Sequence, residues 1–240
     1  MNNFCPLISL NPAIRAGYYA VFNAYRAFCL VPLLIVACSD NTQLQALDIN
    51  ATVLAFGDSL TYGTGTSRDK AYPAILQTLI RRKVINVGIP GETSEQGLRR
   101  LPALLDAYHP DLIIICHGGN DILRKLDLSK TQKNIQQMID LARHNNTEVI
   151  LIAVPAFNLF LSKVAIYQSL ANDNNIPIED NSLAKILASN ALKSDYIHPN
   201  STGYQQLAED ISQLLKRYWA ITNDSRLLDS RQINEQIDIF

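Results

Sequence analysis

The sequence is poor in several features that mark common protein classes. It has four cysteines, and three of them, Cys5, Cys29 and Cys38, lie close to the N-terminus, which is not the pattern of a disulfide framework. Cys116 stands alone in an apolar run, and no cysteine and histidine spacing resembles a zinc site. No metal or cofactor is therefore expected, and Cys116 is interpreted as a small core residue.

The sequence also has no marked excess of positive or of negative charge. The formal net charge of the 240 residues is −1, and no basic cluster stands out along the chain. A protein that binds nucleic acid usually carries a basic patch that neutralises phosphates. The composition therefore argues against a nucleic-acid partner. The sequence also shows no internal repeat and no low-complexity tract.

No hydrophobic run is long enough to span a bilayer, which takes about 20 apolar residues. Residues 27–37 form a shorter apolar run behind Arg15 and Arg26, as in a signal peptide. The run ends in Ile35-Val36-Ala37-Cys38, which resembles the lipobox of bacterial lipoproteins. That resemblance implies lipidation of Cys38, export to the periplasm and, with Ser39 following, an outer-membrane anchor. An ordinary cleaved signal and an uncleaved membrane anchor are the alternatives.

These features divide the chain into four predicted parts. Residues 1–38 are a signal peptide with a lipobox-like end, and the polar residues 39–50 are a tether. Residues 51–218 form one folded domain, and the polar, mixed residues 219–240 form a loosely packed tail. A domain of this size can bury a substantial apolar core.

Within the domain, short apolar runs alternate with segments of helical periodicity. Each run is rich in Val, Ile or Leu, as expected for a strand that is buried on both faces of a parallel sheet. The five predicted strands are Thr52–Phe56, Val84–Val87, Leu112–Cys116, Val149–Val154 and Ile176–Ile178. The predicted helices are Ala71–Arg82, Ser94–Tyr108, Thr131–His144 and Ser201–Tyr218. The alternation predicts an α/β fold, a three-layer α/β/α sandwich around a five-stranded parallel sheet with right-handed crossovers.

Polar residues follow the carboxyl ends of the first three predicted strands, where such sheets bind their ligands. Ser59, in Gly57-Asp58-Ser59, offers a hydroxyl nucleophile after the first strand. After the second strand, a glycine of the loop 86–93, either Gly88 or Gly91, can bring its backbone N–H close to an oxyanion, and after the third strand the amide of Asn120 can donate to one. Each motif also has a simpler interpretation as an ordinary strand-to-helix turn. His117, just before Asn120, is a possible base, but a structural or wall role is the simpler interpretation.

A base is offered by the late segment Asp195-Tyr196-Ile197-His198-Pro199. Three residues of spacing can place the Asp195 carboxylate against Nδ1 of His198 and leave Nε2 free to accept a proton. A helix is expected to start after Pro199, at Asn200 or Ser201. The alternative is a capping aspartate beside a surface histidine.

Taken in order, the blocks Gly57-Asp58-Ser59-Leu60, Gly91, Gly119-Asn120-Asp121 and Asp195-x-x-His198-Pro199 resemble the SGNH (GDSL) hydrolase family. The likeness is greatest to its bacterial periplasmic thioesterase/lysophospholipase and arylesterase branch. It covers about residues 52 to 217, and the stretches 91–98, 100–105 and 118–124 extend it beyond the catalytic blocks. The resemblance implies the flavodoxin-like sandwich predicted above for residues 51–218.

The resemblance also implies residue roles. Ser59 is the expected nucleophile, His198 the general base and Asp195 the residue that orients His198. The oxyanion donors would be the backbone N–H groups of Ser59 and Gly91 and the side-chain amide of Asn120. Asp58 and Asp121, next to these atoms, are expected to hold the turns in shape rather than to transfer protons.

The substrates that the family implies are small-molecule esters, thioesters and lysophospholipids. Leu123 and Arg124, beside the Asn120 block, are candidates for the wall of the substrate site. Phe157 lies in an apolar, loop-like stretch that either lines an acyl pocket or packs on the core. Acyl-chain length and oligomeric state are left open.

Three other functions are alternatives to this prediction. The second hydrolase hypothesis is a carbohydrate O-acetylesterase that acts on envelope polysaccharide. A catalytically silent envelope-binding protein would be free to lose any one of Ser59, Gly91, Asn120, Asp195 and His198, yet all five are present. A nucleotide-binding domain is disfavoured because the chain has neither Gly-x-Gly-x-x-Gly nor a P-loop motif.

Overall fold

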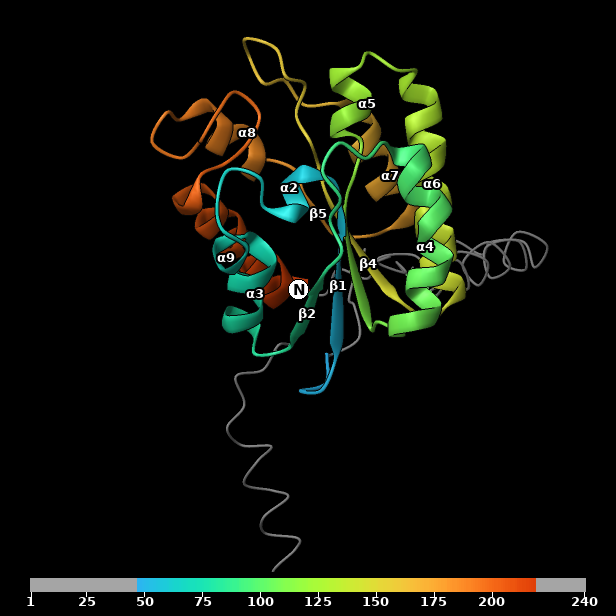
Figure 1. Ribbon diagram of the computed structural model, residues 1–240. Helices are drawn as coiled ribbons and strands as arrows, with labels where there is room; N and C mark the ends of the chain where they lie inside the picture. The colour runs from blue at the N-terminus through green and yellow to red at the C-terminus, as the bar shows by residue number, and fades with distance from the viewer. Residues whose placement is uncertain (1–46, 219–240) are drawn as a thin grey trace, which may run out of the picture. The chain divides into compact units, whose positions relative to one another are not determined.

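The computed structural model describes residues 47–218 (Figure 1). The predicted signal peptide with Cys38, most of the predicted tether and the predicted C-terminal tail lie outside these residues. The described part begins just before the first strand and ends with the last residue of a long helix.

The centre of the fold is a parallel sheet of five strands in the order β2-β1-β3-β4-β5. Each of the three inner strands is paired on both sides, as with β1, which pairs with β2 and with β3. The strands are β1 (Thr52–Gly57), β2 (Lys83–Asn86), β3 (Leu112–Cys116), β4 (Glu148–Ile152) and β5 (Ile178–Glu179). The predicted five-stranded parallel sheet is therefore confirmed.

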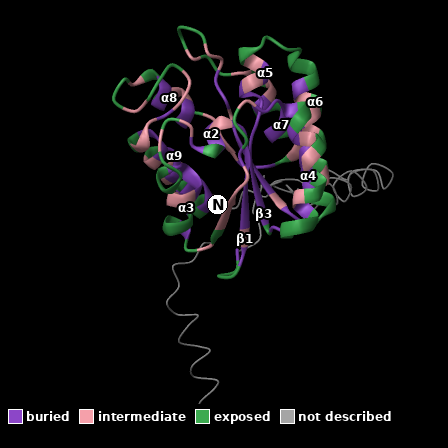
Figure 2. Ribbon diagram, viewed as in Figure 1, coloured by how far each residue is buried: buried purple, intermediate pink, exposed green. Residues whose placement is uncertain are grey.

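The inner strands are apolar because both of their faces are covered. All five residues of β3 are buried, and in β1 so is every residue from Val53 onward. Figure 2 shows this buried centre between the two helical layers. Alternating polarity would have left one face of the sheet to solvent, whereas continuous apolar runs require a helical layer on each side.

Helices supply these two layers. On one face of the sheet lie α3 (Tyr72–Ile80), α8 (Ser182–Ala188) and α9 (Ser201–Tyr218) (Figure 1). On the other lie α4 (Ser94–Tyr108), α6 (Leu128–His144) and α7 (Ala165–Asn174) (Figure 1). The predicted three-layer sandwich is thus confirmed. No helix within residues 47–218 is long and apolar enough to cross a membrane.

Three shorter elements lie in the loops that follow strands. The helices α2 (Ser59–Tyr62) and α5 (Gly119–Leu123) follow β1 and β3, and a 3-10 turn spans Arg68–Lys70. Both α2 and α5 start at the carboxyl edge of the sheet, so they place polar residues there. The sequence offered no periodicity from which helices of four and five residues could be predicted.

The structure differs from the sequence-based expectation at some boundaries. The predicted helix Ala71–Arg82 ends at Ile80, because Arg81 takes up a left-handed conformation with φ of 54°. The predicted strand Ile176–Ile178 is shifted to Ile178–Glu179, since Pro177 has no N–H to donate to a neighbouring strand. The second and fourth strands each start one residue earlier than predicted and end one and two residues earlier.

Candidate active site

Ser59 is delivered to the carboxyl edge of the sheet by the turn between β1 and α2. Asp58 caps the helix, since its Oδ1 accepts a hydrogen bond of 3.0 Å from the Leu60 N–H. Gly57 is required just before it, because a Cβ there would lie 2.4 Å from the Cys116 carbonyl oxygen. The tight strand end and the cap together fix Ser59 as the first residue of α2.

His198 and Asp195 come to Ser59 from the loop before α9. Nε2 of His198 lies 3.0 Å from Oγ of Ser59, and Nδ1 of His198 lies 2.8 Å from Oδ2 of Asp195. The other oxygen of Asp195 accepts from the backbone N–H groups of Ile197 and His198, at 2.8 and 2.9 Å. The structure therefore brings the three predicted residues together in a line of hydrogen bonds.

The surroundings of this line suit proton transfer. The side chain of His198 is 13% exposed and that of Asp195 is 51% exposed. Burial alone would raise the pKa of Asp195, but the hydrogen bonds from Ile197 and His198 outweigh it and hold the pKa below its ordinary value. An ionised Asp195 favours the tautomer with the proton on Nδ1 and leaves the Nε2 lone pair facing Ser59.

The predicted oxyanion donors lie in the loops after β1, β2 and β3. No hydrogen-bond acceptor within the described chain is bonded to the backbone N–H of Ser59 or of Gly91. Nδ2 of Asn120 donates two hydrogen bonds, to the Glu92 carbonyl oxygen at 3.0 Å and to Oδ2 of Asp58 at 3.2 Å. The bond to Asp58 is the longer, so its N–H is the one that would turn from Asp58 to an incoming oxyanion.

The structure also shows which of the two glycines in the loop after β2, Gly88 or Gly91, has an available N–H. Gly91 has φ of 78°, a conformation that L side chains rarely adopt. Gly88 uses its N–H in a 3.0 Å hydrogen bond to the Asn86 side chain, so this donor is already occupied. Of the two, Gly91 therefore has the available N–H.

The predicted wall residues occupy different environments. Leu123 ends α5 and is 41% exposed, and the neighbouring Arg124 donates through Nη2 to the Gly91 carbonyl at 2.8 Å. Phe157 lies in the loop between β4 and α7 and packs, partly buried, against the core. The structure thus ties Arg124 to the Gly91 loop and packs Phe157 against the core, while the roles of these residues in a substrate wall stay predictions.

The two aspartates next to the site have structural contacts. Asp58 is buried, and burial raises the pKa of its carboxyl even though His117 opposes the shift. Asp121 accepts from the backbone N–H and the hydroxyl of Ser94, at 2.9 and 2.6 Å, and from Thr131 at 3.2 Å. Asp121 therefore fastens α5 to the first turn of α4 and to α6.

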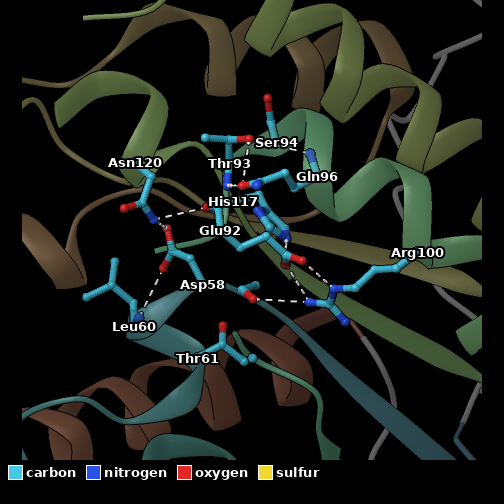
Figure 3. Close-up of polar contacts among 12 residues, drawn as sticks. Asp58, Leu60, Thr61, Glu92, Thr93, Ser94, Gln96, Arg100, His117 and Asn120 are labelled. Atoms are coloured by element: carbon cyan, nitrogen blue, oxygen red, sulfur yellow. Dashed lines mark hydrogen bonds and ion pairs between the residues drawn. The ribbon is translucent and has the colours of Figure 1, made fainter. Parts of the chain in front are cut away.

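Sequence reasoning missed one feature of this region, the ion pair between Glu92 and Arg100 (Figure 3). Glu92 stands next to the predicted oxyanion residue Gly91, which was the available signal. Arg100 gave none, because a charged residue in an amphipathic helix is expected on the solvent face.

No group of three or more His, Cys, Asp and Glu side chains within residues 47–218 is arranged to hold a metal ion. Cys116 is buried at the end of β3, where burial raises the pKa of its thiol well above the ordinary value. It is a core residue of the sheet and not a reactive thiolate.

The fold and the site define a class of protein. A serine hydroxyl, an imidazole and a carboxylate stand in hydrogen-bonded order at the carboxyl edge of a parallel sheet in an α/β/α sandwich. Backbone and amide donors lie in the neighbouring loops. This is the arrangement of a serine hydrolase.

The chain belongs to the GDSL-like lipase/acylhydrolase family, whose model matches residues 55–206. It is 34% identical over 175 residues to the thioesterase 1/protease 1/lysophospholipase L1 of Escherichia coli strain K12, covering 69% of this chain and 83% of that protein. It is 29% identical to the arylesterase of Vibrio mimicus, covering 69% and 88%. The predicted family is thereby confirmed, and the protein is an ester-bond hydrolase.

Solved structures agree with this assignment. The psychrotrophic esterase EstA from Pseudoalteromonas sp., inhibited by monoethylphosphonate, superposes with a TM-score of 0.64 at 26% identity. The match covers 70% of this chain and 98% of the esterase. The similarity takes in nearly all of that esterase, so the catalytic fold is present as a whole.

Proposed function

We propose that the protein hydrolyses carboxylic esters, thioesters or lysophospholipids through an acyl-enzyme formed on Ser59. The observation that carries the proposal is the line from Ser59 Oγ through His198 to Asp195, with separations of 3.0 and 2.8 Å. The neutral hydroxyl of Ser59 lies against Nε2 of His198, and the other ring nitrogen of His198, Nδ1, is held by the carboxylate of Asp195.

In the first step His198 Nε2 takes the proton from Ser59 Oγ while the oxygen attacks the substrate carbonyl carbon. The C=O electron pair moves to the carbonyl oxygen, which becomes the oxyanion. The donors that stabilise it are the N–H groups of Ser59 and Gly91 and the amide N–H of Asn120 that otherwise donates to Asp58. Loss of one such donor costs about 10²–10³-fold in kcat in a well-studied serine hydrolase.

Collapse of this intermediate breaks the bond to the leaving group. His198 gives its proton to the departing alcohol or thiol, which leaves the acyl group esterified to Ser59 Oγ. Water then attacks the acyl carbon with His198 again accepting a proton. The second collapse releases the acid and returns the proton to Ser59. Asp195 stays ionised throughout and stabilises the imidazolium.

The substrate class is supported by the relatives and by the rim of the site. Two relatives are named as a thioesterase/lysophospholipase and an arylesterase. Leu123, half-exposed at the end of α5, offers an apolar surface three residues from Asn120. An apolar wall of this kind favours an acyl or aryl group over a sugar ring.

A substrate panel tests the proposal. Wild-type protein and Ser59→Ala are assayed on p-nitrophenyl acetate, a long-chain acyl thioester, a lysophospholipid and an acetylated glycan. We expect turnover of the first three by the wild type and none above background by Ser59→Ala. Turnover of the glycan alone would support the O-acetylesterase function instead. No turnover of any substrate, together with no labelling of Ser59 by a fluorophosphonate, would support a silent binding protein.

The location of the enzyme is a separate part of the proposal. Its support is the apolar run that ends in Ile35-Val36-Ala37-Cys38, ahead of the first strand at Thr52. We propose that Cys38 is lipidated and tethers the enzyme to the periplasmic face of the outer membrane. A fatty-acid analogue should label the wild type and not Cys38→Ala. Equal labelling of both proteins would contradict the anchor.

A further inference from the structure

A largely buried ion pair begins at the residue next to Gly91, one of the proposed oxyanion donors. Nε and Nη2 of Arg100 each donate a 2.6 Å hydrogen bond to one carboxylate oxygen of Glu92, a two-pronged pairing (Figure 3). The side chain of Glu92 is 6% exposed and that of Arg100 is 21% exposed. The guanidinium also lies 4.5 Å from the centre of the Phe56 ring, over its face. Such a pair has a single well-defined geometry.

This ion pair connects the loops that follow the first three strands of the chain. Nη2 of Arg100 lies 3.4 Å from the carbonyl oxygen of Gly57, two residues before Ser59. Glu92 directly follows Gly91, in the loop after β2. Oε2 of Glu92 lies 3.4 Å from Nε2 of His117, at the end of β3. Each proposed oxyanion donor is therefore within three residues of a group that touches the ion pair.

The backbone of Glu92 also holds Asn120 directly. The Glu92 carbonyl oxygen accepts one amide N–H of Asn120 at 3.0 Å. Since an amide group is planar, fixing one N–H fixes the direction of the other, the one proposed to bind the oxyanion. The Glu92 side chain is thus clamped by Arg100, while its main chain orients Asn120 and continues into Gly91.

His117, which follows β3, contacts the same carboxylate of Glu92. Its ring is fully buried, and neither nitrogen makes a hydrogen bond within residues 47–218. The ring packs against Phe56, with centroids 4.7 Å apart, and covers Gly97 of α4. A Cβ on Gly97 would come within 2.5 Å of the His117 Nε2, so glycine is needed at this point of the helix. His117 is therefore shut off from the substrate, and it acts on the site through its 3.4 Å contact with Glu92.

The Glu92 carboxyl is charged despite its burial. Burial alone would raise its pKa, but His117 and Arg100 lower it, and the pKa stands below its ordinary value. Glu92 and Arg100 are consequently both fully charged at neutral pH, and the removal of one partner leaves the other charge without its partner in a largely buried place.

We propose that Arg100 and Glu92 are positioning residues for the oxyanion hole, which hold Gly91 and Asn120 in the geometry that stabilises the transition state. This inference rests on the proposed hydrolase function. It assigns the pair an effect on the charge that develops during reaction, and none on substrate binding.

The test compares two adjacent arginines of α4. Arg100→Met breaks the clamp. Arg99→Met is the matched control, because Arg99 pairs with Glu95 on the surface, where both side chains are more than half exposed. On p-nitrophenyl acetate we expect Arg100→Met to lower kcat by about 10–100-fold and to leave KM within about threefold, a partial loss of oxyanion stabilisation. Arg99→Met should match the wild type.

Two further measurements separate positioning from mere loss of structure. An aryl boronic acid forms a tetrahedral adduct on an active-site serine, so its inhibition constant should weaken by the same factor as kcat/KM. A folding defect would lower the active fraction and leave the inhibition constant of the remaining enzyme unchanged. The double variant Arg100→Met/Glu92→Gln buries no unpaired charge, and it should still show the loss of kcat.

The inference is overturned if the folded double variant keeps kcat and the boronic acid constant within about threefold of the wild type, a change too small for a displaced oxyanion donor. That result would leave the proposed function intact, because the wild type would still be active. Failure of the proposed function has a different signature, since Ser59→Ala and the wild type would then show equal rates.

Discussion

The two sides of the active site are built in opposite ways. The oxyanion side is made of buried side chains from distant parts of the chain, such as Asp58, Glu92 and Asp121. The base side is a single loop in which Asp195 and His198 are three residues apart and Asp195 is half exposed. One side is therefore fixed by the fold, and the other largely by hydrogen bonds within five residues of sequence.

This contrast predicts that substitutions on the two sides affect stability and catalytic activity differently. A change on the base side removes few contacts with the rest of the molecule, so activity should fall while the fold persists. A change on the oxyanion side leaves buried polar groups without partners, so stability and activity should fall together. The following experiments, from the largest expected effect to the smallest, test whether that division holds.

The largest effect is expected on the base side. His198→Ala removes the proton acceptor of Ser59, and kcat should fall by at least about 10³-fold, as in other serine hydrolases. The free energy of unfolding, measured in urea, should stay within about 1 kcal/mol of the wild type, because the imidazole is not part of the core. Wild-type turnover in this variant would contradict the role of His198.

A smaller loss of activity is expected for Asp195→Ala. The carboxylate orients the imidazole and does not itself exchange a proton with substrate. In a comparable triad the loss of the aspartate costs over tenfold less than the loss of the serine or the histidine. Steady-state kinetics of Asp195→Ala and His198→Ala under the same conditions make the comparison. A larger effect for Asp195 would mean that it does more than orient His198.

On the oxyanion side, Asp121→Ala should chiefly cost stability. It removes the acceptor of the Ser94 N–H and hydroxyl in a buried site, and it leaves the Thr131 hydroxyl with only the Asp127 carbonyl oxygen as an acceptor. The expected loss in the free energy of unfolding is about 2–4 kcal/mol. Asp195→Ala serves as the control, since its half-exposed carboxylate should cost less than about 1 kcal/mol. Equal losses in the two variants would erase the contrast between the two sides.

The contribution of the ion pair between Glu92 and Arg100 to the free energy of unfolding should depend on pH. The folded pKa of Glu92 lies below the unfolded value, so its contribution is complete above about pH 4.3, the ordinary glutamate value, and is lost as the pH falls through the folded pKa. The difference in free energy of unfolding between wild type and Glu92→Gln should therefore be largest near neutral pH and shrink in acid. A difference that does not change with pH would contradict an ionised clamp.

The smallest effect is expected at the rim. Leu123→Ala trims an exposed apolar surface and should raise KM for a long-chain thioester by about 2–10-fold, because a buried CH₂ is worth about 0.8 kcal/mol and this surface is only partly covered. Its kcat on p-nitrophenyl acetate should not change. An equal change with both substrates would mean that Leu123 supports the site and does not contact the acyl chain.

The same contrast explains what could be predicted from the sequence. The sheet could be predicted because its buried strands are continuous apolar runs, as in β3. The base side could be predicted because Asp195 and His198 belong to one short motif. The helix α7 was missed, since its end is rich in the poor helix formers Asn172, Asp173 and Asn174.

The clamp of Arg100 and Glu92 was missed for a different reason. The two residues are eight positions apart, and their contact depends on how α4 packs over the carboxyl ends of β1 and β3. No local pattern carries that information. Pairs that depend on the packing of a helix against the sheet follow from the fold and can be seen only once the elements are placed.

The most direct test of the account is to find where a fluorophosphonate attaches. The folded protein is treated with the probe, digested and analysed by mass spectrometry, with Ser59→Ala and His198→Ala alongside. The account predicts one adduct on Ser59 in the wild type, no adduct in Ser59→Ala and much slower labelling in His198→Ala. An active enzyme with Ser59 unlabelled, or with the adduct on another residue, would contradict it.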